Sequence, residues 1–187
     1  MSLEYSSRLL RLISEQTRVE ALAAKTAEEG SQYLEGALDQ LIEGARARII
    51  DDIVPAEFLD AASFKMWQLH QSLEPVWYLY SKYYWERIDE RGALVGRTGF
   101  TDVMAKIAES LEGEDRITVL DSTVRFITNN EPDLTGRIET LILLAQDLKT
   151  QGLPGEASQI ARFLNTSTPK GLMDKNRFTE EIHQILS

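Results

Sequence analysis

The chain contains no cysteine, and this absence removes several kinds of chemistry at once. Disulfide bonds, thiolate nucleophiles and cysteine-ligated zinc sites are all excluded. The absence also suits a reducing compartment, so we expect a cytoplasmic protein. The sequence has no run of about 18 apolar residues, and its N-terminus has no basic region followed by an apolar core. We therefore expect neither a membrane-spanning helix nor a secretory signal.

Basic residues are outnumbered. The 187 residues include 20 Lys and Arg against 30 Asp and Glu, which gives a net charge of −10 at pH 7. The excess acid is spread along the chain rather than held in a tail. Because such a surface repels phosphate groups and anionic lipid headgroups, we expect no nucleic-acid or membrane partner.

Residues that break helices are also few, since there are 5 prolines and 11 glycines. Apolar residues recur every three or four positions along most of the chain, which is the periodicity of amphipathic helices. A chain of this length buries roughly 70% of its unfolded surface, so a core can form without cross-links. We predict an all-α, multi-helix bundle that forms a single domain over residues 1–187. The glycine-rich loop at 92–99 is the candidate boundary between two sub-bundles.

Nine of the aromatic residues, including all three tryptophans, lie in one stretch from Phe58 to Trp85. The apolar positions in this stretch form one helical stripe: Phe58, Ala62, Met66, Leu69, Leu73, Val76 and Tyr80. Pro75 interrupts it, so either one helix kinks there or a second helix starts at Glu74 or Pro75. Since the stripe keeps its phase, we favour a kink or a tight restart. We predict that this aromatic-rich, proline-kinked helix is the centre of the bundle.

Residues 115–129 allow two interpretations. Their β-branched content fits a small two-stranded hairpin, whereas four apolar residues fall on one helical face: Ile117, Leu120, Val124 and Ile127. We favour the helix, because an isolated hairpin is only marginally stable. Further helices are predicted from about Phe100 to Leu111, from Asp133 or Thr135 to Thr150, from Pro154 onward, and from about Lys175 to Leu186. In the helix that starts at Pro154, we expect Ile160, Ala161, Phe163 and Leu164 to face inward.

Motifs with chemical specificity are scarce. Glu180 and His183 have the Glu-x-x-His spacing of di-iron bundles, but such sites need the motif twice, and His70 has no glutamate three residues before it. Arg97 lies near the predicted start of a helix and could hold an anion, but Asp102 in the first turn competes for the same position. The sequence thus predicts no catalytic residue, no metal site and no cofactor.

Two classes of function fit these observations. The first is a non-enzymatic helical interaction or regulatory protein, which acts through an aromatic-rich surface or a homo-oligomer interface on a protein partner or on itself. The alternative is a small-molecule-binding protein or enzyme, with an aromatic-lined pocket near His70 and Arg97. Both readings point to one set of ligand- or partner-binding residues: Trp67, His70, Glu74, Trp77, Tyr80, Tyr84, Trp85 and Arg97.

Overall fold

The computed structural model describes residue 60 and residues 63–68, 71–81, 95–167 and 177–187. These residues are predominantly α-helical, and no strand occurs among them, which confirms the predicted all-α, multi-helix bundle. The chain divides into two compact units, Met1–Arg91 and Gly92–Ser187, which we describe separately. Apolar spacing over residues 4–52 predicts one long helix or two nearly collinear ones, and this segment lies outside the described residues.

In the unit Met1–Arg91, the chain restarts a helix at Pro75 rather than bending one continuous helix. Residues 63–68 are helical, and α4 (Glu74–Leu79) follows with Pro75 in its first turn. Between them Gln71 has a φ of 52°, and its N–H donates to the carbonyl oxygen of Trp67 at 2.7 Å. A left-handed residue of this kind ends a helix and satisfies one of its last carbonyl groups. Four members of the predicted stripe are described: Met66, Val76 and Tyr80 are buried, whereas Leu73, next to the break, is half-buried.

In the unit Gly92–Ser187, α5 (Val95–Glu109) begins five residues before the predicted helix. The prediction of a loop through Gly99 is therefore wrong from Val95 onward. Glycine weakens a helix by about 1 kcal/mol, but this local preference is small beside tertiary packing. Gly99 is buried within α5. The spacing of Val103, Ile107 and Leu111 predicts one apolar face; Val103 and Ile107 are buried, whereas Leu111 follows the end of α5 and is half-buried.

The ambiguous segment forms the 18-residue helix α6 (Gly113–Asn130), so the hairpin alternative is wrong. Three of its threonines donate their hydroxyl groups to the carbonyl oxygens four residues earlier, at 2.7 to 2.8 Å: Thr118, Thr123 and Thr128. These bonds satisfy side chains that otherwise compete with helical backbone bonds. Of the three, only Thr123 lies on the buried side of α6, where its hydroxyl group is satisfied within the helix.

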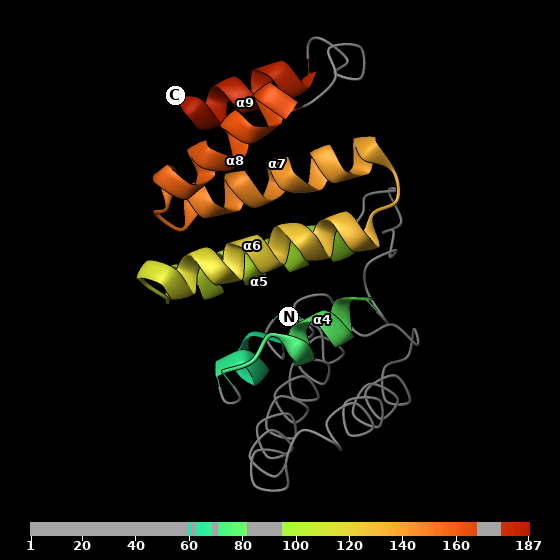
Figure 1. Cartoon of the computed structure of the whole chain (residues 1–187), viewed down its shortest axis with the longest axis vertical. Helices are drawn as coiled ribbons and strands as arrows, with labels where there is room; N and C mark the ends of the chain where they lie inside the picture. The colour runs from blue at the N-terminus through green and yellow to red at the C-terminus, as the bar shows by residue number, and fades with distance from the viewer. Residues whose placement is uncertain (1–59, 61–62, 69–70, 82–94, 168–176) are drawn as a thin grey trace, which may run out of the picture. The chain divides into compact units, whose positions relative to one another are not determined.

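Helix α7 (Leu134–Thr150) is the centre of this unit. It is buried around most of its circumference and packs against α5, α6, α8 and α9. Figure 1 shows α7 between the α5–α6 pair and the α8–α9 pair. Asp133 caps its N-terminus by accepting a hydrogen bond from the N–H of Gly136 at 3.0 Å. At the other end Gly152 has a φ of 81°, and this left-handed conformation favours glycine.

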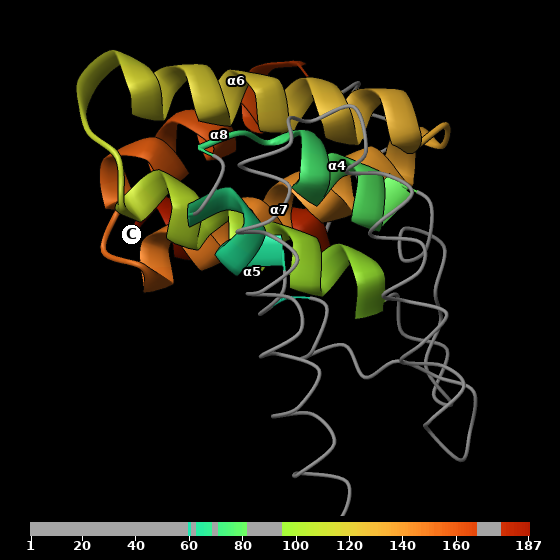
Figure 2. The same ribbon diagram turned by 90° about the horizontal axis from the view of Figure 1, so that it is seen from below.

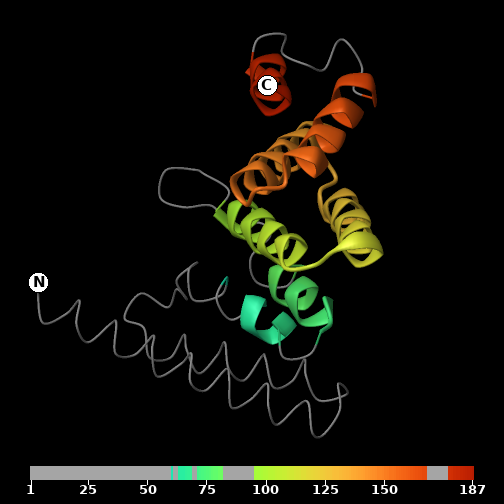
Figure 3. The ribbon, with the colours of Figure 1, turned by 90° about the vertical axis from the view of Figure 1, so that its left-hand side faces the viewer.

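Helices α8 (Pro154–Ser167) and α9 (Arg177–Leu186) complete the unit and pack against each other. Figure 3 shows α9 nearly end-on beside α8. Four apolar residues predict the inward side of α9, and three of them are buried, Phe178, Ile182 and Ile185, whereas Leu186 is half-buried. The inward side predicted for α8 is only partly correct, because Ala161 and Leu164 are buried whereas Phe163 is 55% exposed.

Two basic side chains connect these helices by capping carbonyl groups. Arg116 of α6 donates from Nε to the carbonyl oxygens of Ala108 and Leu111, both at 2.9 Å, and from Nη1 to Glu156 of α8 at 3.0 Å. Lys149 of α7 donates from Nζ to the carbonyl oxygen of Gln184 at 2.7 Å. Positive charge at the C-terminal end of a helix is favourable because the free carbonyl groups there carry partial negative charge.

Candidate functional site

The predicted ligand- or partner-binding residues are divided between the two units and the undescribed parts of the chain. His70, Tyr84 and Trp85 lie outside the described residues. Four of the others belong to Met1–Arg91: Trp67, Glu74, Trp77 and Tyr80. The last, Arg97, belongs to Gly92–Ser187.

Two of the predicted aromatic residues are buried side chains. Tyr80 is 1% exposed, and its hydroxyl group donates to a carboxylate oxygen of Asp60. Trp67 is also buried, and its ring lies 5.7 Å from that of Phe64, between centroids. Trp77 is half-buried. Tyr80 and Trp67 therefore do not offer a solvent-facing aromatic surface.

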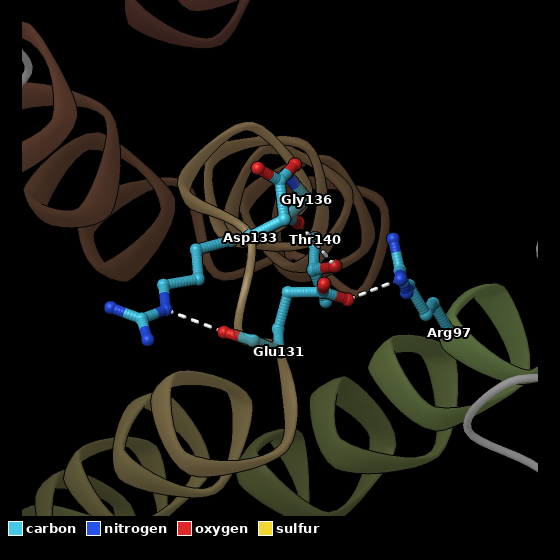
Figure 4. A network of polar contacts seen from close by, with 6 residues as sticks. Arg97, Glu131, Asp133, Gly136 and Thr140 are labelled. Carbon is cyan, nitrogen blue, oxygen red and sulfur yellow. Dashed lines mark hydrogen bonds and ion pairs between the residues drawn. The ribbon is translucent and has the colours of Figure 1, made fainter.

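Arg97 forms an ion pair with Glu131, which lies between α6 and α7 (Figure 4). Only 5% of the Glu131 side chain and 13% of the Arg97 side chain are exposed. The backbone of Glu131 is held as well, because its N–H donates to the carbonyl oxygen of Ile127 and its own carbonyl oxygen accepts from Nε of Arg137. Buried charges are tolerated when they are paired in this way.

Gly136 provides the space that this ion pair needs. A Cβ atom at position 136 would lie 2.7 Å from both Cδ and Oε1 of Glu131. The hydroxyl group of Thr140 closes the same turn by donating to the carbonyl oxygen of Gly136 at 2.8 Å (Figure 4). The N-terminal end of α7 is thus already supplied with two internal carboxylates, those of Asp133 and Glu131. We interpret this network as a structural connection between α5, α6 and α7 rather than as a ligand site.

A second polar group lies between α7 and α5. Burial is the main cause that raises the pKa of the Asp147 carboxyl group above its ordinary value of 3.8, and the negative charge of Asp102 acts in the same direction. A hydrogen bond with Thr101 and the positive charge of Lys106 oppose this rise in part. Lys106 also donates to Asp102 at 2.6 Å. Among the described residues no group of three or more His, Asp or Glu side chains is placed to hold a metal ion. Asp147 is thus tied to α5 by the hydrogen bond with Thr101 and by the charges of Asp102 and Lys106, and we treat it as a group that bears on stability.

The apolar residues that the bundle leaves uncovered are more informative. On α6 the buried side consists of Val119, Thr123 and Ile127. Of the four apolar residues that share one helical face, only Ile127 belongs to this buried side. Ile117 is 60% exposed, and Leu120 and Val124 are half-buried. We call Ile117, Leu120 and Val124 the α6 stripe.

The α6 stripe follows one side of the helix over two turns, because its members are three and four residues apart. Figure 2 shows α6 along one edge of its unit. The exposed acids Glu114 and Asp121 stand three residues before and four residues after Ile117, and so lie beside the stripe. An apolar stripe with a charged margin is typical of a helix that receives another helix.

The sequence places the residues of the α6 stripe on one apolar helical face but does not say which side of α6 faces the core. The row of threonines is the signal that could have done so, since Thr123 substitutes for an apolar residue once its hydroxyl group is bonded within the helix. The ion pair of Glu131 was missed entirely. A polar residue directly before a proline suggests an exposed turn, and only Gly136, five residues later, hints at a buried carboxylate.

Comparisons with models of protein families, with curated proteins and with solved structures found no match. Among the described residues no helix combines the length and the apolar character needed to cross a membrane.

Proposed function

We propose that this protein is a non-enzymatic helical interaction protein and that it binds a protein partner through the α6 stripe. The observation that supports this proposal is the exposure of Ile117, which is 60%, next to two further apolar residues on the same side of α6. Single exposed apolar residues are common on protein surfaces and need no explanation. A contiguous set with helical spacing and a charged margin is more typical of a protein–protein contact.

The contact is assigned to α6 rather than to the aromatic residues because Trp67 and Tyr80 are buried. A small-molecule site near Arg97 has less support, since Glu131 already neutralises the guanidinium group. The proposal includes a cytoplasmic location, which cell fractionation would test.

Site-specific photocrosslinking in the cells that produce the protein would test the proposal. A photoreactive p-benzoylphenylalanine replaces Ile117 in one variant and Asp115 in a control variant. Both positions are exposed and lie on α6, but successive helical residues are turned by about 100°, so they face nearly opposite directions. We expect a light-dependent adduct with a polypeptide from position 117 and none from position 115. Equal adducts from both positions, or none from position 117, would contradict the proposal.

A further inference from the structure

We propose that the partner of the α6 stripe is an amphipathic helix whose apolar side is bordered by Lys or Arg residues. This inference rests on the proposed function and specifies the chemistry of its partner. It follows from three properties of α6: the geometry of the stripe, the charges beside it and the rigidity of its backbone.

The geometry favours a helix. The α6 stripe has the three- and four-residue spacing of one helical ridge and spans about 10 Å along the axis. A second helix complements such a ridge by placing its own side chains on either side of it. Pairing with an added strand would need an exposed sheet edge, and the described residues contain no strand.

The charge favours a basic partner. The one exposed base of α6 is Arg125. Four exposed acids belong to α6 and its N-cap: Glu112, Glu114, Asp115 and Asp121. Around the helix, Asp121 and Glu114 lie about 40° and 60° from Ile117, and Arg125 lies farther round at about 80°. The residues that border the exposed edge of the stripe are therefore acidic. Arg116 does not offset them, because its guanidinium group is bonded to α5 and α8.

The same charges argue against a second copy of this chain as the occupant. Two copies that met through the α6 stripe would bring Glu114 and Asp121 of each near those of the other, and like charges in contact suppress association. A basic partner instead turns these residues into attractive ones. Because the acids border one edge of the stripe and the core borders the other, the basic residues of the partner belong along one edge of its apolar side.

The backbone of α6 is fixed before any partner arrives. Threonine hydroxyl groups bond within the helix, and Arg116 links its first turns to α5 and α8. A rigid surface loses little conformational entropy on binding, so a short stripe can still give measurable affinity.

Fluorescence anisotropy with the full chain and synthetic peptides would test this inference. The probe is a labelled 16-residue helical peptide with Leu at three- and four-residue spacing and Lys beside the Leu side. One control peptide carries Glu in place of Lys, and another keeps the composition but scrambles the Leu positions. We expect the Lys peptide to bind with a Kd on the order of 10–100 µM and both controls to bind at least about tenfold more weakly.

Matched variants of the protein separate recognition from general attraction to an acidic chain. Ile117→Ala should weaken binding of the Lys peptide by about tenfold. The double variant Glu114→Lys with Asp121→Lys should instead prefer the Glu peptide. Glu112→Lys with Asp115→Lys makes the same change of charge farther from Ile117, and we expect it to retain the preference for Lys.

Equal effects of the two double variants would overturn the inference, as would equal binding of the scrambled peptide or no binding of the Lys peptide. Light scattering gives a further test, because a dimer that Ile117→Asp dissociates would mean that a second copy covers the stripe. In each of these cases a specific photocrosslink from position 117 would still support the proposed function, so the two proposals can fail separately.

Discussion

Replacing Gly136 by alanine should destabilise the protein, although the same change in an ordinary helix is stabilising. Alanine is favoured over glycine in helices by about 1 kcal/mol. At position 136, however, the added Cβ atom would lie 2.7 Å from the carboxyl carbon of Glu131. Non-bonded carbon atoms do not approach so closely, so the carboxylate must move.

A shift of the Glu131 side chain disturbs its ion pair with Arg97. Its backbone is bonded on both sides, through Ile127 and Arg137, and its carboxylate is paired with Arg97. Separating a buried ion pair costs about 3–5 kcal/mol, and the partial exposure of Arg97 places the cost near the lower value. After the gain in helix propensity is subtracted, we expect Gly136→Ala to lower the free energy of unfolding by about 2–3 kcal/mol.

The reasoning makes a sharper prediction for the double variant. In the background of Glu131→Ala the obstructing carboxylate is absent, so Gly136→Ala should become stabilising by about 0.5–1 kcal/mol. Gly155→Ala is the matched control, because Gly155 also lies in the first turn of a helix but has no atom within 4 Å of its added Cβ. It should be neutral or stabilising in both backgrounds.

The assay must report on the unit that contains Gly136. Every tryptophan and tyrosine precedes residue 92, so intrinsic fluorescence follows the unit Met1–Arg91 alone. Urea unfolding should therefore be followed by far-UV circular dichroism, with hydrogen exchange of peptides from α7 as a local readout. A stabilising effect of Gly136→Ala in the wild-type background, or the same effect in both backgrounds, would refute the role assigned to Glu131.

Three further predictions concern charged groups in the same unit. Asp147→Asn should raise the urea midpoint at pH 7, because burial raises the pKa of Asp147 in the folded state and stability therefore falls as pH rises above 3.8. The difference should vanish below pH 3.8. Arg116→Ala should cost about 1–3 kcal/mol in urea unfolding and Glu156→Ala no more than about 1, because only Arg116 also caps carbonyl groups. Lys149→Ala should cost about 0.3–1 kcal/mol, with faster hydrogen exchange in α9 and an effect that shrinks as salt is added.

The sequence predicts α7 and α9 well because local and tertiary preferences agree there. Asp133 is a strong N-cap residue, and the apolar positions of α7 repeat without interruption up to Leu148. The sequence does not predict the beginning of α5, because glycines close together are typical of a loop. Whether a glycine is a hinge or a buried helical position depends on what packs against it, and that information lies elsewhere in the chain.

The candidate site illustrates a different limit of sequence reasoning. Periodicity identifies the apolar sides of a helix, but it does not determine which side the bundle uses. On α6 two sides compete: the stripe with Ile117, and the side with Thr123 and Ile127. The bundle buries the second side. Thr123 can lie in the core there because its hydroxyl group is hydrogen-bonded within the helix.

Because the bundle buries the side with Thr123 and Ile127, Ile117 adds little to the stability of the described fold. Isoleucine is a poorer helix former than Lys, Arg, Gln or Glu, and at 60% exposure it contributes little burial. Phe163 on α8 is exposed to a similar degree and has one half-buried apolar neighbour on the same side, Ile160, whereas Ile117 has two, Leu120 and Val124. Positions where local composition and the packed fold disagree are often those shaped by function. The α6 stripe is the longer of these two apolar sets and has acids beside it, and for that reason we place the proposed contact there.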